Sequence, residues 1–145
     1  MMLNASHAAT PAETGAARSI LIAEDEMLVR LCISHELREA GYVVYEAAEA
    51  DSALSILDGE SVDILITDIR MPGDLDGLQL ARRVREERPQ THILLLSAYI
   101  TRDIEMFDGA FPKPVRIRDL IARVRRLPKA TNVDAGSSRR WETTD

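Results

Sequence analysis

Residues 63–73 read DILITDIRMPG, and this stretch decides the fold of the chain. The run from Val62 to Thr67 is almost continuously apolar and ends at Asp68, before a loop that contains proline and glycine. An apolar run without alternation belongs to a strand that is buried on both faces, as in a parallel sheet covered by helices. We therefore predict a central strand that ends in a carboxylate.

Similar apolar runs recur on both sides of this strand, with helical patterns between them. Strands are predicted at Ser19–Ala23, Tyr42–Glu46 and His92–Leu96, and a fifth at Ala110–Phe111 after the short segment Thr101–Asp108. Helices are predicted at Met27–Ala40 (ended by Gly41), Asp51–Asp58, Gly77–Arg88 and Arg116–Leu127. Alternating strands and helices predict an α/β fold with a parallel sheet, whose chemistry lies beyond the carboxyl ends of the strands.

Composition narrows the class of protein. The chain has 145 residues, 46% of them hydrophobic, which is ordinary for a single globular domain. No apolar run reaches the roughly 18 residues of a membrane span, and the first residues lack the pattern of a secretory signal. Cys32 is the only cysteine, so no internal disulfide can form. We expect a cytoplasmic protein, and the net charge of −6 argues against nucleic acid as its main partner.

Five polar residues stand where the predicted strands end. The first strand is followed by Glu24 and Asp25, the third by Asp68, the fourth by Ser97 and the fifth by Lys113. Carboxylates that meet at one edge repel one another, and a bound hard cation removes that penalty. Oxygen ligands of this kind suit Mg²⁺. Asp68 could then act as a nucleophile toward a phosphoryl group, with Lys113 and the metal balancing the charge and Ser97 donating a hydrogen bond.

At this point the sequence resembles the receiver domain of the two-component response regulators. The resemblance covers about residues 19–127 and rests on five segments: ILIAEDE (20–26), DILITDIRMPG (63–73), DGLQLARRVR (76–85), LLLSA (94–98) and FPKP (111–114). It implies a flavodoxin-like receiver fold, with a five-stranded parallel sheet in the order 2-1-3-4-5 between helices.

The resemblance also implies roles for individual residues. Asp68 matches the phosphoacceptor, and Glu24 and Asp25 match the acidic pair that holds Mg²⁺. The backbone carbonyl of Arg70 matches a further metal ligand. Ser97 matches the switch hydroxyl, and Lys113 matches the lysine that contacts the phosphoryl group and precedes a cis peptide bond to Pro114.

The sequence departs from the family pattern at three places. The first acidic position is Glu24 rather than the usual aspartate, so we expect it to act through water. The loop MPGDLDG after Asp68 is one residue longer than the common form. Fifteen residues separate Ser97 from Lys113, so the helix expected there is short, irregular or missing. Ala110 occupies the position of the family's aromatic switch residue, a role that Tyr99 could partly take.

These observations lead to one functional hypothesis. We expect a disordered arm (1–18), a receiver domain (19–127) and a flexible tail (128–145). The domain would be a Mg²⁺-dependent phosphoacceptor that takes a phosphoryl group onto Asp68 from a sensor histidine kinase or a histidine phosphotransfer protein, and would not be an enzyme in its own right. We expect its output to be contact with a downstream protein or onward phosphotransfer, because the tail is too short for an effector domain.

Two alternatives remain at this point. The acidic edge could belong to a protein-docking module that works without phosphorylation. The basic last helix, with Arg116, Arg118, Arg123, Arg125 and Arg126, could bind DNA, although a single basic helix without a reading motif is weak evidence for that.

Overall fold

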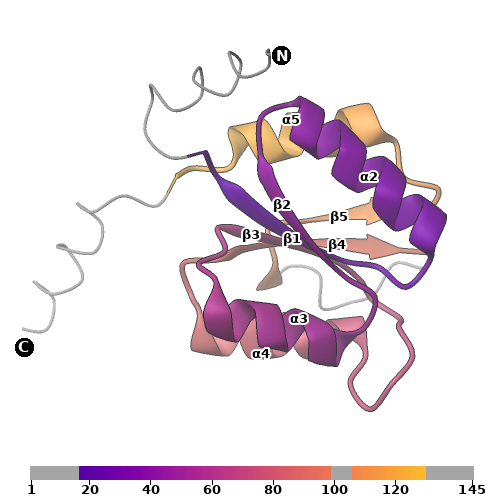
Figure 1. Cartoon of the computed structure of the whole chain (residues 1–145), viewed down its shortest axis with the longest axis vertical. Coiled ribbons are helices and arrows are strands. Elements are labelled where there is room, and N and C mark those ends of the chain that lie inside the picture. Colours follow the sequence, from indigo (N-terminus) through magenta and orange to yellow (C-terminus); the bar gives the residue numbers. More distant parts are fainter. Residues whose placement is uncertain (1–16, 99–105, 130–145) are drawn as a thin grey trace, which may run out of the picture.

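The computed structural model describes residues 17–98 and 106–129. The elements in chain order are β1 (Ser19–Ala23), α2 (Met27–Glu39), β2 (Val43–Ala47), α3 (Ala50–Gly59), β3 (Ile64–Asp68), α4 (Gly77–Glu87), β4 (His92–Ser97), β5 (Gly109–Pro112) and α5 (Ile117–Arg126). The five strands form one parallel sheet in the order β2-β1-β3-β4-β5 (Figure 1). The order implied by the resemblance is therefore confirmed.

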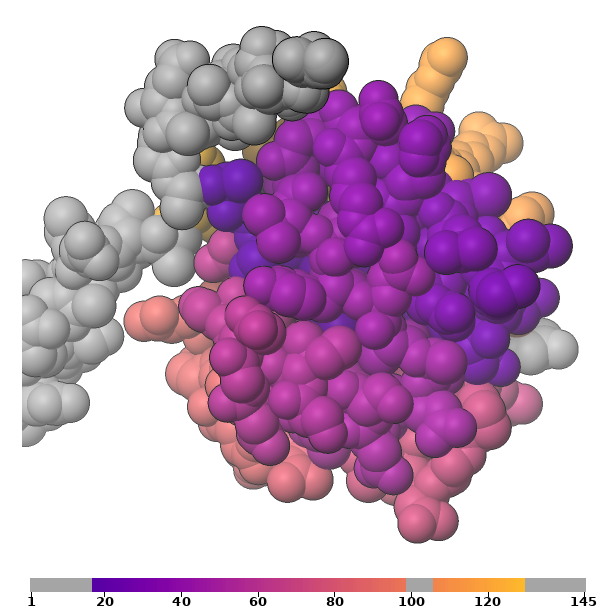
Figure 2. Space-filling model, viewed as in Figure 1, coloured from indigo at the N-terminus to yellow at the C-terminus, as the bar shows by residue number. Residues whose placement is uncertain are grey.

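Helices cover both faces of the sheet, α2 and α5 on one side and α3 and α4 on the other (Figure 1). In the view of Figure 2, residues coloured indigo to magenta, from the first half of the chain, form most of the facing surface. Alternate residues of each central strand serve the two layers. Ile20 and Ile22 of β1 pack toward α2 and α5, whereas Leu21 packs toward α3 and α4. All residues of β1 and β3 are buried, which explains why both strands are mostly apolar.

The helix ends follow local sequence signals. Gly41 lies directly beyond α2 with a φ angle of 103°, a conformation that glycine adopts without a Cβ clash. Helix α4 begins with a capping box, in which the Asp76 carboxylate accepts from the Gln79 N–H at 2.8 Å and the Gln79 amide oxygen accepts from the Asp76 N–H at 2.9 Å.

The predicted elements form, with ends that differ by one or two residues. Asp68, predicted to follow β3, is its last residue, and Arg116 and Leu127 flank α5 rather than belonging to it. Two sets of apolar residues lie on different faces of α2. Ile33 and Leu37 face the sheet, whereas Leu28 and Leu31 are 73% and 44% exposed. Most of the segment between β4 and β5 (99–105, with Tyr99) lies outside the described residues.

Both ends of the described chain meet at one place. The Arg18 guanidinium donates to the Leu127 carbonyl at 2.8 Å and to the Pro128 carbonyl at 3.1 Å. The rest of the predicted arm and tail lies outside the described ranges. Within residues 17–98 and 106–129, every helix is too short or too polar to cross a membrane.

Candidate functional site

The strand-end residues predicted from sequence converge on one edge of the sheet. Glu24 and Asp25 follow β1, Asp68 and Ser97 end β3 and β4, and Lys113 follows β5. We call Glu24, Asp25, Asp68 and Lys113 the strand-end cluster. A cleft of 420 Å³ opens beside it and is lined by Asp68, Arg70, Ser97 and Lys113, among others. The structure therefore brings all the predicted site residues to this edge.

Lys113 lies at the centre of the strand-end cluster. Its ammonium donates to Asp68 Oδ2 at 2.9 Å and lies 3.0 Å from Glu24 Oε1 and 3.5 Å from Glu26 Oε1. Burial alone would lower the pKa of Lys113, but the hydrogen bond to Asp68 and the charges of Asp68 and Glu24 outweigh it and hold that pKa well above its usual range. Lys113 is therefore a fixed positive charge beside Asp68. The peptide bond between Lys113 and Pro114 is cis, as the resemblance implied.

Glu24 is fully buried, unlike an ordinary surface carboxylate. Its Oε2 accepts from the Glu26 N–H at 2.9 Å, whereas its Oε1 forms an ion pair with the Lys113 ammonium at 3.0 Å and makes no hydrogen bond within the described residues. Burial raises the pKa of Glu24, the charge of Asp68 raises it further, and the Glu26 N–H and Lys113 offset this only in part. The site therefore holds a buried carboxylate oxygen that is paired with an ammonium but makes no hydrogen bond among the described residues.

Oxygen atoms from Glu24, Asp25 and Asp68 all lie within 4.8 Å of one another. Three carboxylates face a single ammonium here, and one buried oxygen has no hydrogen-bond donor. A small divalent cation with an oxygen preference would satisfy that oxygen and offset the excess negative charge. The residues present therefore fit Mg²⁺.

Asp68 is held by the backbone around it. It is 7% exposed, and its Oδ1 accepts from the Arg70 N–H at 3.2 Å. Helix α4 begins against the same residue: a Cβ placed on Gly77 would lie 1.5 Å from the Asp68 carbonyl oxygen. Only glycine allows this close approach. Gly77 was not identified from sequence, although a glycine directly after the capping residue Asp76 is a signal for such packing.

The aromatic switch position has no aromatic side chain. Ala110 is exposed on β5, and its neighbour Phe111 packs toward the α2 and α5 layer. The structure therefore places no aromatic side chain at this position of β5.

Comparison with known proteins places this site in a family. The profile of the response regulator receiver domain matches residues 20–125, from β1 into α5. The chain belongs to this family. Receiver domains accept phosphoryl groups from histidine kinases, and they are generally phosphoacceptors rather than true enzymes.

Individual relatives agree with this assignment. The chain is 31% identical over 132 residues to the transcriptional regulatory protein TcrA of Mycobacterium tuberculosis and 34% identical over 122 residues to PdtaR of the same species. These matches cover 83% and 79% of this chain but 52% and 58% of the relatives, so the receiver domain spans about half of each.

A solved structure with a similar fold was obtained with a metal bound. The response regulator TrrA of Thermotoga maritima, in complex with Mg²⁺ and BeF, matches with a TM-score of 0.70 and 30% identity, covering 77% of this chain and 99% of that one. The acidic cluster of Glu24, Asp25 and Asp68 is thus typical of a receiver Mg²⁺ site.

Proposed function

We propose that the protein is a Mg²⁺-dependent phosphoacceptor that receives a phosphoryl group on Asp68 from a phosphohistidine of a sensor histidine kinase or a histidine phosphotransfer protein. The observation that carries this proposal is the placement of Asp68 in the wall of the cleft, with its Oδ2 on Lys113 and the carboxylates of Glu24 and Asp25 within 4.8 Å.

The transfer balances as a substitution at phosphorus. A carboxylate oxygen of Asp68 forms a bond to phosphorus, the phosphorus–nitrogen bond to histidine breaks, and the imidazole nitrogen leaves with the bonding electrons. Lys113 lies where its ammonium can pair with an oxygen of the arriving group. Ser97 lines the same cleft, from which its hydroxyl can donate to another phosphoryl oxygen.

Glu24, Asp25, Asp68 and the Arg70 carbonyl would hold Mg²⁺ in this proposal. When bound, the metal supplies positive charge that keeps the carboxylates ionised and offsets charge on the phosphoryl oxygens. Glu24 is too buried to leave the site, so its role is to fix the inner wall of the metal position.

An apolar surface beside the cluster supports a protein as the donor. Met27, Leu28 and Leu31 on the first turns of α2 are exposed, and Lys113 lines both the cleft and an apolar groove of 660 Å³ next to α2. A docked domain can therefore cover apolar surface while it presents a phosphohistidine to Asp68.

Phosphorylation by a small molecule tests the acceptor. Incubation with acetyl phosphate and Mg²⁺ is expected to add one phosphoryl group to the wild type, measured by intact mass. Asp68→Asn protein, or wild type in excess chelator, is expected to gain none. Equal incorporation in the variant would contradict the proposal, because the acceptor would lie elsewhere. A wild type that gains no phosphoryl group would favour the docking module.

A second pair of variants tests the docking surface. Leu28→Glu is expected to slow transfer from a phosphorylated histidine phosphotransfer protein while leaving the acetyl phosphate reaction unchanged. Val43→Glu is the matched control, because Val43 is also exposed but begins β2 at the other end of the sheet. Equal slowing by both variants would contradict docking on α2.

A further inference from the structure

Strand β5 leads directly into Lys113, yet the strand is short and has a neighbouring strand on one side only. It has four residues, lies at the edge of the sheet and pairs only with β4. Ala110 and Pro112 on one of its faces are exposed. In a parallel ladder, each residue advances by about 3.3 Å, so a slip of one residue would move Lys113 by more than the length of its bond to Asp68. The register of so short a strand must be fixed by what holds its ends.

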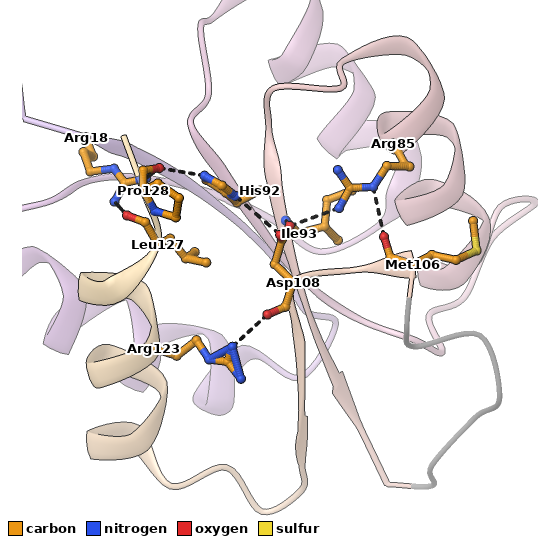
Figure 3. Close-up of polar contacts among 9 residues, drawn as sticks. All are labelled: Arg18, Arg85, His92, Ile93, Met106, Asp108, Arg123, Leu127 and Pro128. Atoms are coloured by element: carbon orange, nitrogen blue, oxygen red, sulfur yellow. Dashed lines mark hydrogen bonds and ion pairs between the residues drawn. The ribbon is translucent and has the colours of Figure 1, made fainter. Parts of the chain in front are cut away.

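One end of β5 is fixed by Asp108, the residue just before the strand (Figure 3). The Asp108 N–H donates to the Ile93 carbonyl at 2.8 Å, and Asp108 Oδ2 accepts from the Ile93 N–H at 2.7 Å. The carboxylate thus occupies the place of a backbone acceptor and extends the ladder with β4 by one step.

Basic side chains from three elements surround the same residue (Figure 3). Arg85 of α4 donates to Asp108 Oδ2 at 3.0 Å and to the Met106 carbonyl at 3.1 Å. His92 Nδ1 lies 3.5 Å from Asp108 Oδ1, and Arg123 of α5 donates to the Asp108 carbonyl at 3.0 Å. We call Asp108 with Arg85, His92, Ile93 and Arg123 the Asp108 anchor. It ties the start of β5 to both helical layers and to β4.

At the other end of β5, Phe111 packs toward the α2 and α5 layer, and the described polar contacts are those of Lys113. The Lys113 N–H donates to the Ser97 carbonyl at 2.9 Å, and its ammonium reaches Asp68 and Glu24. A phosphoryl group that takes over the ammonium would release this hold on the carboxylates. The Asp108 anchor is then what keeps the strand in register.

We propose that Asp108 is a positioning residue for Lys113: by fixing the start and register of β5 it sets where the ammonium meets Asp68. The consequence for phosphorylation rests on the proposed phosphoacceptor function, whereas the geometric consequence for Lys113 does not.

The amine resonances of lysine test the geometry directly. The chain has only two lysines, Lys113 and the exposed Lys129, so ¹⁵N-lysine NMR gives one signal from the site and one internal reference. Asp108→Asn keeps an oxygen for the Ile93 N–H but removes the charge that holds Arg85 and His92. We expect it, and more weakly Arg85→Gln, to move the Lys113 ammonium signal toward that of Lys129.

Two reaction measurements separate positioning from general loss of stability. In Asp108→Asn we expect phosphorylation by acetyl phosphate to slow by about tenfold, within the roughly 100-fold loss that a small misplacement of a reacting group can cause. Mg²⁺ affinity, measured by calorimetry, is expected to stay the same or rise, because Lys113 is not a metal ligand and competes for Asp68. General unfolding would lower both.

Two controls complete the design. Arg83→Gln removes a guanidinium of α4 that pairs only with Glu87 on the same helix, among the described contacts. Leu57→Ala destabilises the buried core under α3 without touching β5. Both are expected to leave the Lys113 signal and the phosphorylation rate of the folded protein unchanged.

The outcomes distinguish the two proposals. If Asp108→Asn matches Leu57→Ala in both the Lys113 signal and the rate, the positioning role is wrong. If the wild type takes no phosphoryl group, the proposed function fails, and the Lys113 signal still decides whether Asp108 positions the lysine.

Discussion

The two ends of β5 carry clusters built from the same kinds of side chain in opposite proportions. In the strand-end cluster, three carboxylates face one ammonium, and the buried Oε1 of Glu24 makes no hydrogen bond among the described residues beyond its ion pair with that ammonium. In the Asp108 anchor, one carboxylate receives a backbone N–H and Arg85 and lies beside His92. A carboxylate saturated with donors stabilises the fold, whereas carboxylates in excess of donors leave a position for a ligand.

The pKa directions express the same difference. Burial alone would raise the pKa of Asp108, but the Ile93 N–H, Arg85 and His92 outweigh it, so that pKa lies below its ordinary value. Burial also raises the pKa of Glu24, and there the donors do not outweigh it. The excess of negative charge at the strand-end cluster therefore costs stability, and a bound cation would remove that cost.

The largest expected effect is at Asp68. Asp68→Asn should abolish phosphorylation by acetyl phosphate, because the amide lacks the nucleophilic oxygen anion. Asp74→Asn, at an exposed loop position between β3 and α4, is the control and should be phosphorylated like the wild type. Phosphate retained by Asp68→Asn would show that the acceptor lies elsewhere.

Metal binding should stabilise only through the strand-end cluster. At a Mg²⁺ concentration about 100 times Kd, the free energy of unfolding should rise by about 2.7 kcal/mol. At that same concentration, Asp25→Asn should lose most of this gain and Asp108→Asn should keep it, as measured by urea unfolding with and without chelator. An equal loss in both variants would mean that the two clusters are not distinct in function.

The same chemical change should have different effects on stability at the two ends of β5. In chelator, Asp108→Asn should lower the free energy of unfolding by about 1–2 kcal/mol, somewhat less than a fully buried charged hydrogen bond because the side chain is 28% exposed. Asp25→Asn should leave it unchanged or slightly higher, because it relieves repulsion among carboxylates. Destabilisation by Asp25→Asn equal to that by Asp108→Asn would contradict the comparison.

The smallest expected effect is on the pH dependence of stability, measured by urea unfolding in chelator between about pH 3 and 7. Because the pKa of Asp108 is lowered in the folded state, the ionised carboxylate stabilises the fold above about pH 4. This contribution to the free energy of unfolding is lost as the pH falls through the folded-state pKa. The raised pKa of Glu24 has the opposite effect on stability. Its contribution to the free energy of unfolding is present below about pH 4 and is lost as the pH rises through the folded-state pKa.

Two variants test which residue causes each part of this pH dependence. Asp108→Asn should flatten the acid side of the curve, and Glu24→Gln should flatten the side above about pH 4. If Asp108→Asn leaves the acid side unchanged, the carboxylate is not held by its donors as described.

Much of the fold was predictable because each strand is a short apolar run and each helix a periodic one. The site was predictable for a related reason: parallel strands place their last residues at one edge, so Asp68, Ser97 and Lys113 had to meet there. The sequence did not show which apolar residues of α2 are buried and which are exposed. Both sets have helical spacing, and only the position of the sheet decides which set is covered.

The Asp108 anchor was not predictable from sequence. Its members come from α4, β4, β5 and α5, and no local spacing connects Arg85 or Arg123 with Asp108. The sequence placed Asp108 only at the end of a short segment before the fifth strand. The burial of Glu24 was also missed, since a carboxylate directly after a strand usually points to water and this one instead turns back to accept from the Glu26 N–H.

The meeting of Arg18 with the Leu127 and Pro128 carbonyls has a practical consequence for protein engineering. His92 Nε2 also lies 2.7 Å from the Pro128 carbonyl oxygen, so entry and exit of the chain are held together beside the Asp108 anchor (Figure 3). A unit whose two ends adjoin can be grafted into a loop of another protein, or joined end to end and reopened elsewhere. Residues 18–128 can therefore be inserted or circularly permuted as one unit. The junction would lie at the amino ends of the strands, opposite the end that carries Asp68.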